Sequence, residues 1–184
     1  MRIVGGERKG TQLTAPRGDG TRPTSDRLRE TIFNILVHRF DGAPHDARVL
    51  DLFAGSGAMG LEALSRGATF ALFVETAMLA RGALRANIDA LGAAGRTRVW
   101  RRDATRLGEC PVPPFGVVFC DPPYGKGLGE KALATAAAGG WTEPDALAVL
   151  EERRDAMPET IAGWQRIETR ASGESAIAFW QRDR

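Results

Sequence analysis

The sequence predicts an α/β fold with a doubly wound, mostly parallel sheet that helices cover on both faces. Beyond residue 46, strand-like runs alternate with helical patterns along the chain. These strand-like runs are apolar along nearly their whole length, as is typical of strands buried on both faces. A length of 184 residues and an apolar content of 43% suit one domain with a substantial core.

The N-terminal part of the chain precedes this alternation and predicts two elements. Residues 1–14 read as two short strands around a glycine-rich turn. Residues 24–40 read as a helix that Thr24 or Ser25 can cap. Its apolar residues recur at helical spacing, so we expect Leu28, Ile32 and Leu36 to face the core.

The remaining elements follow from apolar runs and from the residues that end them. Gly67 is predicted to stop the second helix, and Thr76 to cap the third. We expect strands at 47–53, 70–75, 98–103, 116–121 and 146–152, helices at 58–66, 77–91 and 128–138, and a final hairpin at 164–171 and 175–182.

Charge is unevenly distributed along the chain. The whole sequence has a net charge of +2, but residues 1–40 carry eight basic and four acidic side chains. A basic end on a nearly neutral body is typical of proteins with a polyanionic partner, although a solvated surface gives the same pattern. The basic residues of this segment are Arg2, Arg8, Lys9, Arg17, Arg22, Arg27, Arg29 and Arg39.

Nothing in the sequence indicates export or a membrane span. The N-terminus lacks the apolar region of a signal peptide, and no run approaches the roughly 18 apolar residues of a membrane helix. The two cysteines, Cys110 and Cys120, fit neither a disulfide framework nor a metal site. We therefore expect a cytoplasmic protein without a bound metal.

A glycine-rich loop, DLFAGSGAMG at residues 51–60, follows the first buried strand. Glycines at 55 and 57 allow a ligand to approach the backbone, and the next helix offers its amino end. Glu75 ends the second strand, and a carboxylate in that position can accept the hydroxyls of a ribose. The loop therefore predicts a ligand that contains a nucleoside.

Two acids favour S-adenosylmethionine over a nicotinamide dinucleotide. Asp51 lies in the strand-to-loop turn, where it would face a ligand's ammonium group and repel a pyrophosphate. Asp103 is predicted to end the third strand, where it can accept a hydrogen bond from an adenine amino group.

The second motif is DPPYG at residues 121–125, at the end of the fourth strand. Two consecutive prolines end the strand and remove two backbone donors, while the carbonyls remain acceptors. The turn thus presents the Asp121 carboxylate, the Pro122 carbonyl and the Tyr124 ring. An acceptor pair beside an aromatic platform suits a planar base with an exocyclic amine.

The chemistry of such an amine explains this arrangement. Its lone pair is delocalised into the ring, and accepting both N–H bonds at Asp121 and Pro122 would direct that pair at a sulfonium methyl group. Asp121 can also take the released proton. Stacking on Tyr124 contributes about 1–3 kcal/mol, and a base inside a helix must first be flipped out.

Together the motifs resemble those of class I S-adenosylmethionine-dependent amino-methyltransferases. RIVGGERKG, RPTSDRLRETIFNIL, LDLFAGSGAMGLEALSRGA, FVE, Asn87 and DPPY look more specifically like the bacterial family that methylates N2 of one guanine in 16S ribosomal RNA. The resemblance covers most of residues 1–125 and implies a Rossmann-like, seven-stranded methyltransferase domain at 24–184 behind an N-terminal β-hairpin extension at 1–23. It further implies action on the assembling small ribosomal subunit.

The motifs, the basic N-terminal residues and the resemblance together suggest residues for three sites. Asp121, Pro122 and Tyr124 are the catalytic residues of the target-base site. The cofactor residues are Asp51, Phe53, Gly55, Ser56, Gly57, Glu75, Thr76, Asp103 and Ala104. The residues expected to bind substrate are Pro123, Arg2, Arg8, Lys9, Arg22, Thr24 and Arg27, with Arg29 as a further candidate for a phosphate contact.

The chain length supports an RNA substrate, because no segment is left over for a DNA-reading domain. Sheet and helix use up both the segment between Gly57 and Asp121 and the segment after Tyr124. Recognition must then come from the basic N-terminus and from substrate shape. We expect a monomer. Methylation of adenine N6 or of a protein glutamine, a non-catalytic RNA-binding module and a Rossmann oxidoreductase remain alternatives.

Overall fold

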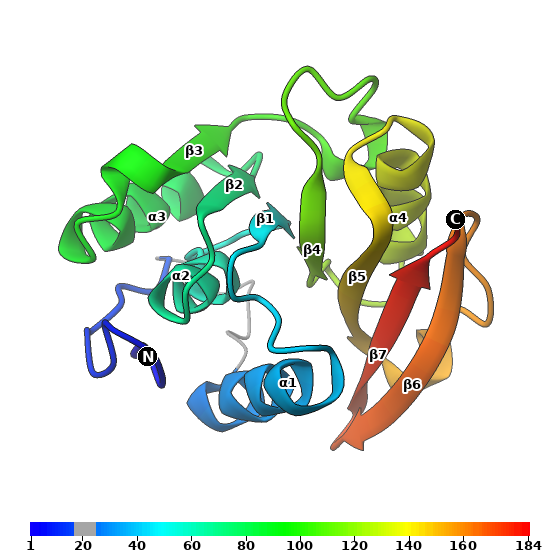
Figure 1. Ribbon diagram of the computed structural model, residues 1–184, viewed down its shortest axis with the longest axis horizontal. Coiled ribbons are helices and arrows are strands. Elements are labelled where there is room, and N and C mark those ends of the chain that lie inside the picture. The colour runs from blue at the N-terminus through cyan, green and yellow to red at the C-terminus, as the bar shows by residue number, and fades with distance from the viewer. Residues whose placement is uncertain (17–24) are drawn as a thin grey trace.

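The computed structural model, which describes residues 1–16 and 25–184, contains one seven-stranded sheet with helices on both faces (Figure 1). The strands are ordered β3-β2-β1-β4-β5-β7-β6, with β1 to β5 parallel and β7 antiparallel to both of its neighbours. This mixed, mostly parallel sheet confirms the predicted fold class. No helix in the described ranges has the length and apolar character to cross a membrane.

The elements follow the predicted order closely. The strands are β1 (Arg48–Leu52), β2 (Phe70–Val74), β3 (Thr97–Trp100), β4 (Phe115–Cys120), β5 (Thr142–Arg153), β6 (Trp164–Ser172) and β7 (Ser175–Arg182). The helices are α1 (Asp26–Arg39), α2 (Ala58–Ser65), α3 (Met78–Ala90) and α4 (Leu128–Ala138), with short 3-10 turns η1 (Ala94–Arg96), η2 (Ala104–Arg106) and η3 (Arg154–Ala156).

Two apolar clusters cover the two faces of the sheet. On one face, Val49 and Phe119 pack with Ile32, Phe33 and other buried residues of α1, α2 and α3. On the other face, Leu50, Leu52 and Val118 of β1 and β4 pack with α4. Alternate residues of β1 enter opposite clusters, as the pleat of a strand requires. Cys120 is buried in the second cluster.

Three predicted boundaries were wrong for local reasons. β3 ends at Trp100 rather than at residue 103, because residues 101–103 leave the sheet and lead into η2 at Ala104. β5 begins at Thr142 rather than at residue 146. Its pairing with β4 is irregular near Pro144 and Asp145, and the φ of Asp145 is +61°. Ala77, not Thr76, lies at the cap position of α3, and no side chain caps that helix.

The N-terminal segment folds back on itself, but it forms less β-structure than the two predicted strands. Residues 1–13 form one antiparallel bridge, Arg2 with Gln12, and five backbone hydrogen bonds among themselves. Ile3 and Leu13 are buried against the body of the protein. At the start of α1, the Ser25 hydroxyl accepts the Leu28 N–H at 3.1 Å, so the predicted serine cap is confirmed.

Candidate active site

The glycine loop joins β1 to α2 at the carboxyl edge of the parallel strands. Two of its three glycines are required by packing, and the third is not. A Cβ at Gly57 would lie 2.2 Å from the Leu84 side chain, and one at Gly60 would lie 2.4 Å from Phe73, so both positions are constrained by packing. Gly55 has a φ of +55° and an uncrowded Cβ direction. Of the three, Gly55 is therefore the one that leaves room for a ligand.

The Glu75 carboxylate holds this loop against the end of β2. One oxygen accepts the Gly55 N–H at 2.9 Å, and the other accepts the Ala77 N–H at 2.8 Å. Glu75 is only partly buried. The sequence placed this acid near the loop correctly, and its second hydrogen bond reaches Ala77, the residue that precedes α3. Thr76 itself is exposed, and its carbonyl accepts from Arg81.

Asp51 is buried beneath the loop and accepts the Gly60 N–H at 3.0 Å. Burial raises the pKa of its carboxyl well above the ordinary value, and the negative charges of Asp121 and Glu75 raise it further. Three carboxyl groups from three neighbouring strand ends therefore act on one another at this edge. Such a cluster favours a cationic ligand.

Asp103 lies three residues beyond β3 rather than at its end. One carboxylate oxygen accepts both the N–H and the O–H of Thr105, at 2.9 and 2.7 Å. The side-chain hydrogen bond from Thr105, followed by the backbone one, lowers the pKa of Asp103. Asp103 is exposed at the carboxyl edge and caps η2, and the next residue, Ala104, is buried.

The Asp-Pro-Pro-Tyr turn leaves β4 next to the glycine loop. Leu52 and Cys120 are register partners on the adjacent strands β1 and β4, so Phe53 and Asp121 leave the sheet side by side. Phe53 adopts a φ of +59° in this turn. Asp121 is half-buried, Pro122 buried and Pro123 exposed. The sequence predicted that the two motifs meet, and the register brings them together.

Two glutamates at the end of β5 grip the turn, and the sequence analysis missed both. The Tyr124 hydroxyl donates to Glu151 at 2.6 Å, and the Gly125 N–H donates to Glu152 at 2.9 Å. Glu151 and Glu152 are 8% and 2% exposed. Acids that directly continue an apolar strand at the ligand edge were the signal that could have identified them.

Tyr124 is held in place with its ring partly open to solvent. Its exposed fraction is 38%. Burial, and then the hydrogen bond to Glu151, raise the pKa of its phenol well above the usual range. The phenol therefore stays protonated and acts as a hydrogen-bond donor to Glu151.

The N-terminal segment is tied to the site by buried polar groups. The buried Asn87 side chain binds both backbone groups of Thr14, at 2.7 and 2.9 Å, and donates to the Ser56 carbonyl in the glycine loop at 2.9 Å. Glu62, which is fully buried, accepts the Val4 N–H at 2.8 Å. The segment is thus anchored to the body at both ends.

Most of the described basic residues predicted to bind RNA lie at the surface. Arg2, Arg8, Lys9 and Arg27 are exposed, and the first two form only loose ion pairs, at 3.8 and 3.9 Å. Arg22 and Thr24 lie outside the described residues.

The expectation for Arg29 was wrong. Its side chain is fully buried and pairs with Glu62 at 3.4 Å and with Asp26 at 2.8 Å. Its role is to join α1 to α2 and to the N-terminal segment, whose Arg2 carbonyl it also binds.

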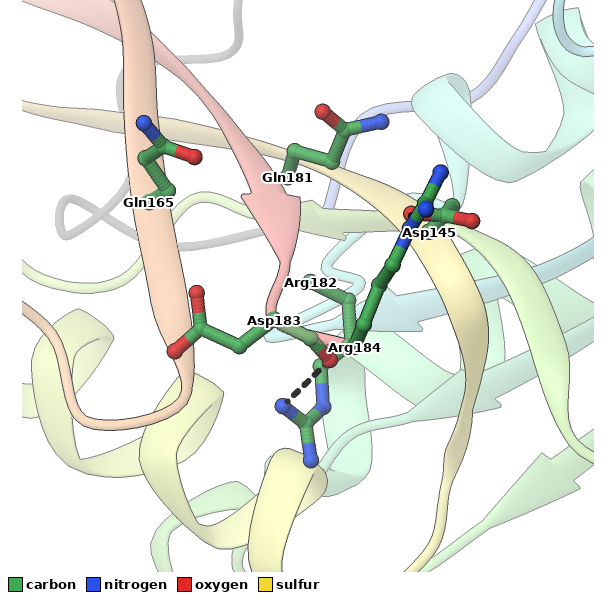
Figure 2. A pocket seen from close by; sticks show the side chains of 6 residues that line it. All are labelled: Asp145, Gln165, Gln181, Arg182, Asp183 and Arg184. Carbon is green, nitrogen blue, oxygen red and sulfur yellow. Dashed lines mark hydrogen bonds and ion pairs between the residues drawn. The ribbon is translucent and has the colours of Figure 1, made fainter.

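A separate hollow lies at the opposite edge of the sheet (Figure 2). It has a volume of about 430 Å³ and is lined by Asp145 and by residues near the start of β6 and the end of β7. None of the residues proposed for cofactor or base binding borders it. Within residues 1–16 and 25–184, no group of three or more histidine, cysteine, aspartate or glutamate side chains is placed to hold a metal ion.

Comparison with known proteins agrees with the geometry. The family described as "Conserved hypothetical protein 95" matches residues 1–181. "Ribosomal RNA small subunit methyltransferase D" of Escherichia coli K12 is 38% identical over 184 residues, which cover all of this chain and 90% of that protein. "Putative rRNA methyltransferase YlbH" of Bacillus subtilis is 34% identical, covering 99% of both chains.

The solved structures give the same result. The structure described as "Putative methyltransferase yhhF" from Escherichia coli aligns with a TM-score of 0.84 and 37% identity, covering 100% of this chain and 98% of that one. This likeness along the whole chain and the family match over residues 1–181 point to one conclusion. The chain belongs to the family described as Conserved hypothetical protein 95.

Proposed function

We propose that this protein transfers a methyl group from S-adenosylmethionine to the exocyclic N2 amine of a guanine in 16S ribosomal RNA of the small subunit. The observation that carries the proposal is the pairing of β1 with β4, which sets the glycine loop and the Asp-Pro-Pro-Tyr turn side by side. Whole-chain relatives named as small-subunit rRNA methyltransferases support the same reaction.

The cofactor site would use the loop, the strand ends and their acids. Glu75 would accept the ribose hydroxyls, and Asp51 would face the ammonium group of the methionine part. The adenine would lie near Asp103 and the buried Ala104, and the remaining contacts would come from Phe53, Ser56, Gly57 and Thr76. The cluster of mutually repelling carboxyl groups around Asp51 supports a cationic ligand such as S-adenosylmethionine.

Bound S-adenosylmethionine supplies an electrophilic methyl carbon, and the chain's own residues prepare the amine. Asp121 and the Pro122 carbonyl accept the two N–H bonds and direct the nitrogen lone pair, while Pro123 keeps the turn rigid. The N–C bond forms as the C–S bond breaks, and Asp121 takes the proton directly or through water. Tyr124, fixed by Glu151, stacks on the flipped guanine.

RNA would be held largely by charge. Residues 1–23 form the recognition extension of a catalytic domain at 24–184, and Arg2, Arg8, Lys9, Arg22, Thr24 and Arg27 contact phosphates. Such contacts position a substrate without reading its sequence, so the shape of the assembling subunit would supply the specificity. We propose that the protein acts there as a cytoplasmic monomer.

Two measurements on the same samples test this proposal. Calorimetry should detect binding of S-adenosylmethionine and none of NAD; the reverse would indicate an oxidoreductase. Labelled cofactor should then transfer its methyl group to undermethylated small subunits with the native protein. Asp121→Ala should abolish transfer with little change in subunit binding, whereas full transfer by this variant would exclude the proposed role of the turn.

A further inference from the structure

A groove between α1 and the β6–β7 hairpin lies beside the target-base turn. It has a volume of about 470 Å³. Ser25, Arg27 and Thr31 of the α1 end and Arg170 and Ser172 of β6 form its walls, and the buried Ile177 of β7 lies at its floor. Its position follows from the β6–β7 turn, which lies at the same edge as the carboxyl end of β5.

A continuous series of contacts joins this groove to Tyr124. The Ser175 hydroxyl lies 3.1 Å from the carbonyl of the groove residue Ser172 and 3.3 Å from Glu151. Glu151 in turn accepts from the Tyr124 hydroxyl at 2.6 Å. Glu151 and Ile177 are also register partners on β5 and β7. The groove therefore begins at β7, the strand next to β5, whose Glu151 holds the Tyr124 hydroxyl.

The walls of the groove carry positive charge and hydrogen-bond donors. Arg27 is exposed and forms no ion pair with the residues that the structure describes. Arg170 pairs with Glu168, which also binds Arg39, so one carboxylate is shared between two guanidinium groups. Among the described residues, the lining itself contains two arginines, Arg27 and Arg170, and no acidic side chain. The positive end of α1 opens onto the same groove.

We propose that this groove receives the phosphate backbone of the RNA next to the nucleotide that stacks on Tyr124. The inference rests on the proposed function, because it assumes an RNA base at the turn. Guanidinium groups and hydroxyls are the groups with which proteins contact phosphates. A base flipped onto Tyr124 leaves its backbone at the protein surface, and the groove offers a charged path from that point.

The test compares two double variants in binding to undermethylated small subunits. Arg27→Ala with Arg170→Ala should weaken binding about tenfold at moderate salt. It should also reduce the slope of log affinity against log salt by about two, one for each lost phosphate contact. The matched control, Arg85→Ala with Arg98→Ala, removes two exposed arginines near the opposite, β3 end of the sheet and should leave both quantities nearly unchanged.

Further readouts separate this inference from the proposed function. The Arg27/Arg170 variant should keep the cofactor Kd and the melting temperature of the native protein. Lysine at both positions should restore most of the salt slope. An affinity and slope equal to those of the control would overturn the inference, even if methyl transfer is normal. Absence of methyl transfer by the unmodified protein would instead contradict the proposed function, and binding would still report on the groove.

Discussion

The buried Arg29 allows a quantitative test of whether this arginine supports the fold or binds RNA. Its guanidinium and the Glu62 carboxylate are both fully buried and lie 3.4 Å apart. Removing one partner of a buried ion pair typically costs about 3–5 kcal/mol, because the other charge is left without compensation. In Arg29→Ala, however, Glu62 would keep Arg66 at 2.8 Å and the Val4 N–H at 2.8 Å.

These remaining contacts place the expected loss at the lower end, at about 3 kcal/mol. For a chain of this size, each kcal/mol lowers the melting temperature by roughly 2–4 °C, so Arg29→Ala should melt roughly 6–12 °C below the native protein. Denaturant titration and thermal melting measure both values. Arg27→Ala is the matched control, because this arginine is exposed on the same helix and should change stability by less than about 0.5 kcal/mol.

The two variants should also differ in RNA binding. At a temperature where both are folded, Arg27→Ala should reduce the salt dependence of subunit binding, and Arg29→Ala should not. If Arg29→Ala were as stable as Arg27→Ala and lost affinity for subunits, the structural role assigned to Arg29 would be refuted.

Three further predictions concern the site. Tyr124→Ala should lower kcat/KM by about 5- to 150-fold, the equivalent of one stacking contact, without changing the cofactor Kd. Glu151→Ala should lower kcat/KM less, and by a smaller factor in a Tyr124→Phe background, because part of its effect passes through that hydroxyl. Glu75→Ala should raise the calorimetric Kd for S-adenosylmethionine at least about tenfold, and an unaltered Kd would contradict the assigned ribose contact. The pKa of Asp51 is raised in the fold, so the folded state keeps its proton to higher pH than the unfolded state. The free energy of unfolding should therefore fall as pH rises above the ordinary pKa of 3.8. Asp51→Asn should remove that fall in denaturant titrations across pH, and it should weaken cofactor binding.

The secondary-structure elements and the two motifs could be predicted from the sequence, because local patterns determine them. Apolar runs and stop residues located the strands and helices, because a buried parallel sheet requires continuous apolar strands. The glycine loop and the Asp-Pro-Pro-Tyr turn could be placed at one edge, because parallel strands all end there. The candidate residues at the ends of β1 and β4 were predicted from those two placements.

What the sequence could not predict depends on contacts between distant segments. Arg29 resembles a surface arginine in a basic segment, and only the packing of α1 on α2 brings Glu62 to it. Glu151 and Glu152 lie on a later strand than their partners in the turn, and the register of β4 with β5 determines that they meet. The end of β3 was misplaced because Arg101 and Arg102 continue a strand-like pattern in the sequence, whereas residues 101–103 belong to no strand.

The identity of the methylated nucleoside tests the account most directly. Undermethylated small subunits would be incubated with the protein and labelled cofactor, and their RNA digested to nucleosides for mass spectrometry. The label should appear in N2-methylguanosine at a single position of 16S RNA and should be absent with Asp121→Ala. Label in N6-methyladenosine, or in ribosomal protein, would contradict the proposed reaction.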